Sequence, residues 1–207
     1  MADTLTILKP RLIEIKPVNF ENPWHSKIVI GPLERGFGHT LGTALRRILL
    51  SSIPGAAIVR VTIDGIVHEF STIPGVEEDG VDIVLNLKGV AFILKGRNDA
   101  TLELKKKGPG VVVAGDFELK DGVEIINPQH VIAHLAEGAE LKITIEVVRG
   151  YGHRIADMDE EIDSSRPVGT LRIDASFSPI RRVTYAVENT RVEQRTDLDK
   201  LIIDLET

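Results

Sequence analysis

Cysteine is absent from the sequence, and this absence excludes several chemistries at once. A chain without thiols forms no disulfide, has no thiolate metal site and has no cysteine nucleophile. Aromatic residues make up only 4% of the 207 residues, so a buried core must be mainly aliphatic. No apolar run approaches the roughly 18 residues of a membrane-spanning helix, and the first residues lack a signal-peptide pattern. We therefore expect a cytoplasmic protein with no membrane contact.

Basic residues are outnumbered as well, with 25 lysines and arginines against 31 acidic residues and a net charge of −6. Much of the affinity of proteins for DNA comes from basic side chains on phosphates. An acidic chain gains nothing from that attraction, so we expect no direct specific DNA binding by this chain. The apolar fraction of 43% and charged fraction of 27% are those of an ordinary globular protein, and the length allows one or two domains.

Most of the sequence has the pattern of short strands. Residues 57–63 (AIVRVTI) alternate, which places Val59, Val61 and Ile63 on one face. Residues 64–70 (DGIVHEF) follow with an Asp-Gly turn, and this arrangement predicts a β-hairpin. Further strands are expected at 27–30, where Gly31-Pro32 would end the strand, and at 91–95, 101–105, 111–114, 123–126, 141–148, 182–187 and 200–205.

Two segments have the period of a helix. Residues 76–88 are one, with Gly89 as its terminator. The other is 34–52 (ERGFGHTLGTALRRILLSS), helical from Thr40 onward. At about 100° per residue, its apolar residues form a stripe about 140° wide that should be buried. This stripe contains Leu41, Ala44, Leu45, Ile48 and Leu49.

The other side of this helix carries Arg46, Arg47 and Leu50. One interpretation is a solvated face on which Leu50 is a single exposed leucine, which is common in proteins. The alternative is a two-sided helix, with one side on its own core and the other on a partner. An apolar anchor between arginines suits that role, because guanidinium groups bind carboxylates bidentately. The periodicity leaves both interpretations open.

Three glycines, Gly36, Gly38 and Gly42, precede or open the helix. Helix N-termini bind phosphate groups, so one alternative is a phosphate- or nucleotide-binding enzyme that uses Gly36–Gly42. The spacing is that of neither the dinucleotide fingerprint nor the P-loop. It favours instead a tight turn and a close approach of the helix to its neighbour.

The remaining polar clusters lack the pattern of an active site. His130 and His134 are four residues apart, as in a zinc-binding helix, but the glutamate that follows the first histidine of a metalloprotease motif is missing. The acidic run 157–163 (DMDEEID) lies in an aperiodic stretch without the rigid support that catalytic carboxylates need. We expect no catalytic residue, no metal and no cofactor, and interpret the acidic run as solvated.

The segment Leu33–Gly55 (LERGFGHTLGTALRRILLSSIPG) resembles the signature of the bacterial DNA-directed RNA polymerase alpha subunit. Other long blocks that resemble this family follow in the same order along the chain. They are 8–11 (LKPR), 64–72 (DGIVHEFST), 85–88 (LNLK) and 190–201 (TRVEQRTDLDKL). The blocks are similar to the N-terminal region of that subunit, which dimerises and supports assembly.

This resemblance implies an α+β protein of two domains. A dimerisation domain with helices on a sheet would comprise residues 1–52 plus 180–207, and a β-rich domain, 53–179, would be inserted in it. The implied function is that of a non-catalytic subunit of a nucleotidyltransferase complex. It would form a homodimer on which the polymerase beta and beta-prime subunits assemble for DNA-templated transcription.

The resemblance also assigns surfaces to residues. The implied dimer interface consists of Phe37, Leu41, Leu45, Ile48 and Leu49. The implied beta-subunit contact consists of Arg46, Arg47 and Leu50, and the implied beta-prime contact of Lys88 and the strand around Ile173. In the family, activators can meet a surface near 157–163. Promoter contacts belong chiefly to a C-terminal domain beyond position 207, so we expect this chain to be a piece of a longer protein.

Overall fold

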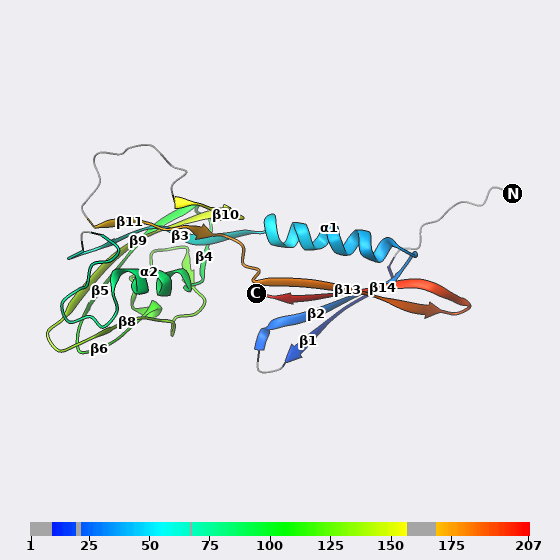
Figure 1. Ribbon diagram of the computed structural model, residues 1–207, viewed down its shortest axis with the longest axis horizontal. Coiled ribbons are helices and arrows are strands. Elements are labelled where there is room, and N and C mark those ends of the chain that lie inside the picture. Colours follow the sequence, from blue (N-terminus) through cyan, green and yellow to red (C-terminus); the bar gives the residue numbers. More distant parts are fainter. Residues whose placement is uncertain (1–9, 20–21, 67, 157–168) are drawn as a thin grey trace. The chain divides into compact units, whose positions relative to one another are not determined.

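A computed structural model describes residues 10–19, 22–66, 68–156 and 169–207 (Figure 1). The predicted α+β class is confirmed. The chain divides into two compact units: the first comprises Met1–Ile53 and Ser178–Thr207, and the second Pro54–Phe177. Within the described ranges, no helix is both long enough and apolar enough to cross a membrane.

The first unit is a four-stranded antiparallel sheet with one helix on it. The strand order is β1-β2-β14-β13, and α1 packs mainly over β13 and β14. The N-terminal pair β1-β2 and the C-terminal pair β14-β13 lie side by side and are joined through the pairing of β2 with β14 (Figure 1). The elements are β1 (Leu12–Asn19), β2 (Asn22–Leu33), α1 (Phe37–Ser51), β13 (Arg182–Val192) and β14 (Arg195–Glu206).

Strand β2 corrects the prediction that Gly31-Pro32 ends the strand. It continues through this pair to Leu33. Leu33 pairs with Asp199 and Ile30 with Leu201, so two residues of β2 lie opposite one residue of β14. Proline cannot donate a backbone hydrogen bond and is tolerated at such a bulge. The irregular register therefore accommodates Pro32 inside the strand.

The second unit is built around a six-stranded sheet with the path β5-β9-β3-β4-β7, in which β11 also pairs with β3. Two further pairs, β6-β8 and β10-β12, form small sheets. The elements are β3 (Pro54–Ile63), α2 (Gly80–Lys88), β4 (Phe92–Leu94), β5 (Asp99–Lys107), β6 (Gly110–Val113), a 3-10 helix (Ala114–Asp116), β7 (Val123–Ile125), β8 (Val131–Leu135), β9 (Glu140–Tyr151), β10 (His153–Arg154), β11 (Thr170–Arg172) and β12 (Ala175–Ser176).

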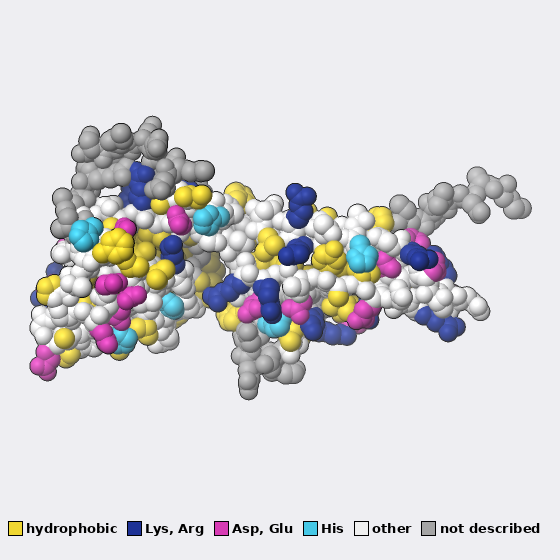
Figure 2. All heavy atoms as spheres, viewed as in Figure 1, with side chains coloured by type: hydrophobic (Ala, Val, Ile, Leu, Met, Phe, Trp, Pro, Cys, Tyr) yellow, Lys and Arg dark blue, Asp and Glu magenta, His cyan; other side chains and the backbone are white. Residues whose placement is uncertain are grey.

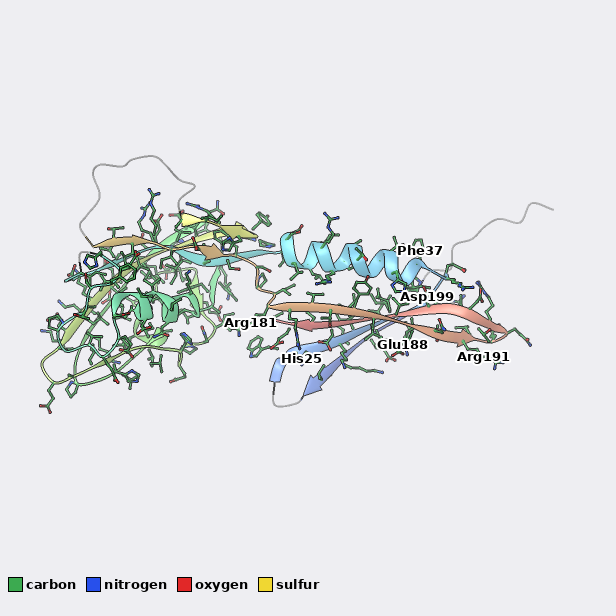
Figure 3. The ribbon with its side chains drawn as sticks, viewed as in Figure 1. His25, Phe37, Arg181, Glu188, Arg191 and Asp199 are labelled. Carbon is green, nitrogen blue, oxygen red and sulfur yellow. The ribbon has the colours of Figure 1, made fainter. Side chains whose placement is uncertain are left out.

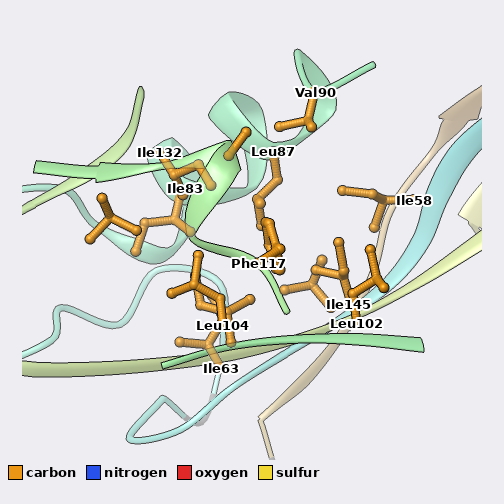
Figure 4. Close-up of a cluster of buried hydrophobic side chains, with 14 of the residues drawn as sticks. Ile58, Ile63, Ile83, Leu87, Val90, Leu102, Leu104, Phe117, Ile132 and Ile145 are labelled. Atoms are coloured by element: carbon orange, nitrogen blue, oxygen red, sulfur yellow. The ribbon is translucent and has the colours of Figure 1, made fainter. Parts of the chain in front are cut away.

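The core of this unit is aliphatic, as the scarcity of aromatic residues predicts. Strands β5 and β9 alternate between buried and exposed residues, so each contributes one apolar face. Helix α2 covers this core through Ile83 and Leu87, both fully buried. Figure 4 shows these side chains with those of Leu102, Leu104 and Ile145 from the strands.

A bulge in β3 corrects the predicted alternation. The register with β9 shifts between Ile58 and Arg60, so the side chain of Ile58 is buried together with Val61 and Ile63, while Val59 is only half-buried. An extra residue in one strand of a pair reverses which side chains face the core. Period-two alternation alone gave the correct face only for the second half of the strand.

The predicted hairpin around Asp64-Gly65 is wrong. Gly65 has the positive φ of a turn, yet residues 66 and 68–70 form no strand. The partners of β3 come from distant segments: Ile63 pairs with Ile143 of β9, and Thr62 pairs with Thr170 of β11. Both neighbouring positions at this end of β3 are therefore occupied by strands distant in sequence.

Helix α2 begins at Gly80, whereas the sequence predicted a start at Val76. Asp79 caps it, because its carboxylate accepts a hydrogen bond from the Asp82 backbone N–H at 2.8 Å. The residues before it are bound to β8 instead, where Val76 bridges to Leu135 and the Glu77 N–H donates to the His134 carbonyl. Gly80 is thus the first residue of the helix, and a side chain there would collide with the Glu69 carbonyl.

Candidate functional site

The beginning of α1 is anchored to the sheet by Asp199. One carboxylate oxygen of Asp199 accepts hydrogen bonds from the backbone N–H groups of Gly36 (2.8 Å) and Gly38 (3.3 Å). Asp199 is buried, and Figure 3 shows it beside Phe37 at this end of the helix. The orphan N–H groups and the positive end of the helix dipole therefore already have an anionic partner from the same chain. This arrangement leaves the phosphate-binding alternative without its proposed site.

A salt-bridge network surrounds this anchor. The Arg195 guanidinium donates to both carboxylate oxygens of Glu34, at 3.0 and 2.8 Å, and also contacts Asp197 at 3.2 Å. Hydrogen bonds from Arg195 hold the pKa of the Glu34 carboxyl and of the Asp197 carboxyl below their ordinary values. The bidentate pair fixes the segment before α1 to the beginning of β14.

Close packing against β13 explains the two helical glycines. A side chain on Gly38 would meet Val187, and one on Gly42 would lie 2.5 Å from the Tyr185 ring. The prediction that these glycines permit a close helix approach is confirmed, and the φ of +83° at Gly36 confirms the tight turn. The Tyr185 hydroxyl also hydrogen-bonds Thr43 at 2.9 Å, which fixes the helix on the strand.

The apolar stripe of α1 is divided by this packing. Leu41, Leu45 and Leu49 pack against the core of the first unit. Ile48 is 53% exposed and Ala44 is exposed too, which corrects the expectation that the whole stripe is buried. Phe37, at the beginning of the helix, is 41% exposed. The reason is that the helix turns its glycine side toward Tyr185 and Val187, so one flank of the stripe points away from the sheet.

The sheet has a second region of exposed apolar side chains on β1. Ile13 pairs with Ile30 and Ile15 with Ile28, and residues directly opposite each other share a face of the sheet. Ile28 and Ile30 pack against the core under α1, so this is the face that carries the helix. Ile13 and Ile15 are nevertheless 66% and 69% exposed, because α1 lies mainly over β13 and β14.

The residues assigned to the two large partners lie in different units. Arg46, Arg47 and Leu50 are exposed on α1, where basic and apolar side chains both reach the surface (Figure 2). Lys88 is exposed at the end of α2 in the second unit. Ile173, by contrast, is 4% exposed and belongs to the core, so its own side chain is not a surface contact.

The two histidines of the weighed zinc motif have separate roles. His134 lies in strand β8 and binds the Glu78 carboxylate through its ring nitrogen at 2.6 Å. His130 lies just before that strand and contacts the Asn86 carbonyl at 2.8 Å. The two side chains therefore bind different groups, the Glu78 carboxylate and the Asn86 carbonyl. The acidic run 157–163 lies outside the described residues.

Sequence comparison adds a family to this geometry. The family model described as "RNA polymerase Rpb3/RpoA insert domain" matches residues 59–178, more than half of the chain and nearly all of the second unit. The chain belongs to the Rpb3/RpoA family of RNA polymerase subunits. The subunits of this family are non-catalytic and serve in polymerase assembly.

Sequence reasoning missed three features of the Rpb3/RpoA chain described above. Asp199 and Arg195 act on residues about 160 positions earlier, so no local pattern reveals their role. Strand β1 went unnoticed, although its alternating Ile13 and Ile15 are a detectable signal. Tyr185 is a lone aromatic in a strand, and its contact with Gly42 follows only from the packed structure.

Proposed function

We propose that this chain is the assembly platform of a bacterial-type, DNA-directed RNA polymerase, acting as an alpha subunit without a catalytic site of its own. Two copies form a homodimer through the first unit, which serves as the dimerisation domain around an inserted second domain. The dimer recruits the beta and beta-prime subunits in the cytoplasm, and the chain itself makes no specific DNA contact. The observation that carries the proposal is the apolar surface left exposed on the first unit.

This surface, formed by Phe37, Ile48, Ile13 and Ile15, is called the platform surface here. Phe37 and Ile48 belong to α1, which already packs on its own sheet, and Ile13 and Ile15 belong to β1. Large apolar side chains exposed on one unit are candidates for a protein interaction site. In a two-fold dimer each contact occurs twice, so a small set of residues suffices for a large effect.

The inner leucines of α1 support the dimer indirectly. Leu41, Leu45 and Leu49 pack on the sheet and hold the helix in place. Leu45→Glu would bury a charge in that core, so we expect an insoluble or unfolded first unit. Ile48→Glu changes an exposed position and should leave the fold intact while preventing the dimer. The two variants therefore separate folding from association.

Sedimentation velocity in an analytical ultracentrifuge tests the dimer. The wild-type chain should sediment as a dimer, and the Ile48→Glu chain as a folded monomer with an unchanged circular dichroism spectrum. Leu119→Glu is the matched control, because Leu119 is also 53% exposed but lies in the second unit. A folded wild-type monomer at high concentration, or equal loss of the dimer in both variants, would count against the proposal.

The contact with beta rests on the exposed side of α1. Arg47→Ala should preserve the dimer but weaken retention of the beta subunit in a pull-down, because an arginine fork lost from an interface removes charged hydrogen bonds. Arg97→Ala, an exposed arginine in the second unit, is the control. For beta-prime, Lys88 and the exposed residues around Ile173 are the proposed contact. Retention of beta by Arg47→Ala at wild-type level would refute the assignment of this face.

A further inference from the structure

Phe37, the first residue of α1, lies between two backbone groups that the same carboxylate binds. One oxygen of Asp199 accepts hydrogen bonds from the N–H groups of Gly36, at 2.8 Å, and of Gly38, at 3.3 Å (Figure 3). The Phe37 N–H itself donates to the Glu34 carbonyl at 2.9 Å. Three consecutive N–H groups are therefore satisfied, and these bonds restrict the backbone that carries the aromatic side chain.

The carboxylate that binds this turn is itself buried. Asp199 is 6% exposed, and among the residues that the structure describes it is the only polar or charged one that is buried. It shares its face of β14 with Leu201, which is fully buried. A buried charge is strongly unfavourable unless hydrogen bonds compensate it. The two N–H groups of α1 provide that compensation, so the strand and the beginning of the helix depend on each other.

The packing around Asp199 leaves this turn little freedom. A Cβ on Gly38 would lie 2.8 Å from Val187 of β13 and 3.1 Å from an Asp199 carboxylate oxygen. Gly36 has a φ of +83°, a left-handed conformation that glycine adopts readily. The helix therefore approaches β13 closely at Gly38, and Phe37 lies about 100° around the helix from that contact. In this position Phe37 is 41% exposed.

A second contact from β14 holds the residues just before the helix. Arg195 donates to both carboxylate oxygens of Glu34, at 3.0 and 2.8 Å. The two side chains are 46% and 33% exposed, and exposed ion pairs contribute about 0.2–1 kcal/mol. The buried contact through Asp199 is therefore the stronger of the two, and the ion pair of Arg195 offers a milder change at the same place.

We propose that Asp199 is a positioning residue for the platform surface, because it holds Phe37 where a second copy of the chain meets it. The inference rests on the proposed function, since it takes Phe37 as a dimer contact. A side chain that is already ordered loses less conformational entropy on binding. Without the carboxylate the first turn of α1 frays, Phe37 samples several positions and the dimer dissociates more readily.

Amide hydrogen exchange tests the positioning in the 207-residue chain, at a protein concentration low enough for the monomer. In Asp199→Ala the amides of Gly36 and Gly38 should exchange about tenfold faster than in wild type, because they lose a charged acceptor. Asp199→Asn keeps an oxygen acceptor without the charge, so its exchange should lie between the two. Thr43→Ala, which removes the hydrogen bond to Tyr185, is the control and should leave both amides unchanged.

A double-mutant cycle measured by sedimentation then asks whether Asp199 acts through Phe37. Asp199→Ala should raise the dissociation constant of the dimer about tenfold, and Asp199→Asn about threefold. Arg195→Ala should raise it by a factor of about five at most. In a Phe37→Ala background, the same changes at Asp199 should have no further effect. If circular dichroism shows that Asp199→Ala does not fold, Asp199→Asn provides the cycle.

The two measurements separate this inference from the proposed function. Equal weakening of the dimer with and without the Phe37 ring would show a merely structural role for Asp199 and overturn the inference. Unchanged exchange at Gly36 and Gly38 in Asp199→Ala would overturn it as well, in a monomer or in a dimer. A wild-type chain that stays monomeric at high concentration contradicts the proposed function instead.

Discussion

The two units differ in how much of their apolar surface they bury by themselves. Among the residues that the structure describes, the second unit encloses 28 buried residues in one core cluster, whereas the first has a cluster of five. In the first unit Ile13, Ile15 and Ile48 are each more than half exposed. The second unit also exposes large apolar side chains, among them Phe70, Leu85 and Tyr151, but it has much the larger core of its own. This difference supports placing the dimer contact in the first unit.

The two units also use their helices differently. Helix α2 has a capped beginning and covers a core with Ile83 and Leu87, which are fully buried. Helix α1 has two glycines against β13 and its only buried residues are those glycines. Burial of apolar area stabilises by about 25 cal/mol per Å², so α2 gains more from its own chain per turn. Helix α1 keeps more side chains available for other contacts.

The largest expected effect compares core truncations in the two units. Leu104→Ala removes a fully buried side chain in the second unit and should cost about 2–5 kcal/mol. Leu41→Ala in the first unit should cost less, because Leu41 is only half-buried. Denaturant unfolding measures both, with circular dichroism for the whole chain and fluorescence of Trp24, the single tryptophan, for the first unit. One shared transition, shifted equally by both changes, would break the comparison.

The next effect concerns the close approach of α1. Glycine to alanine in an exposed helix stabilises by about 1 kcal/mol, but Gly42→Ala places a methyl group against the Tyr185 ring. We expect the sign to reverse, with a loss of about 1–3 kcal/mol. The loss would be measured as a shift of the unfolding transition followed by Trp24 fluorescence. Thr43→Ala, which removes the hydrogen bond to Tyr185, is the control and should cost about 1 kcal/mol.

The smallest effect is a pH dependence confined to the second unit. The hydrogen bond to Glu78 raises the pKa of His134 above the ordinary histidine value of about 6.5, although partial desolvation opposes it. Burial raises the pKa of Glu78, but hydrogen bonds from the His134 side chain and backbone N–H outweigh it and leave this pKa lowered. The negative charge of Glu77 also raises the pKa of His134.

The signs of these shifts fix the pH window. The histidine contribution is complete below about pH 6.5 and is lost as pH rises through the raised pKa of His134. The carboxylate contribution is present above the ordinary glutamate pKa and is lost as pH falls through the lowered pKa of Glu78. Glu78→Gln should therefore remove a fall in the unfolding midpoint that begins near pH 6.5 and continues as pH rises through the raised pKa of His134. An unchanged slope in that variant, or the same slope in the Trp24 signal, would contradict this assignment.

Sequence periodicity correctly predicted helices and strands that can be recognised without knowing which segments they pack against. Helix α1 was found from its leucines, and the long alternation of β9 from Leu141 onward was found from period two. The scarcity of aromatics correctly predicted an aliphatic core. The roles of Phe37, Arg47 and Lys88 at interfaces remain predictions from the family resemblance.

Distant pairing decided what local pattern could not. The Asp64-Gly65 turn exists, but β9 and β11 occupy the positions beside β3 that a hairpin partner would need. The bulge at Ile58 and the shift at Pro32 each depend on the opposing strand. Asp199 gains its role at the helix beginning only when β14 is placed in the sheet. These features result from tertiary contacts, which a single window of sequence does not contain.

The position of β14 between β2 and β13 has a consequence for synthesis on the ribosome. Domains generally fold in the order in which they emerge, and residues 54–177 emerge before β13 and β14. Until β14 has left the ribosome, β2 can pair only with β1, and Asp199 is not available to hold the beginning of α1. The proposed pairing of two copies is thus confined to chains translated beyond this strand, so an interrupted translation product would not enter a dimer.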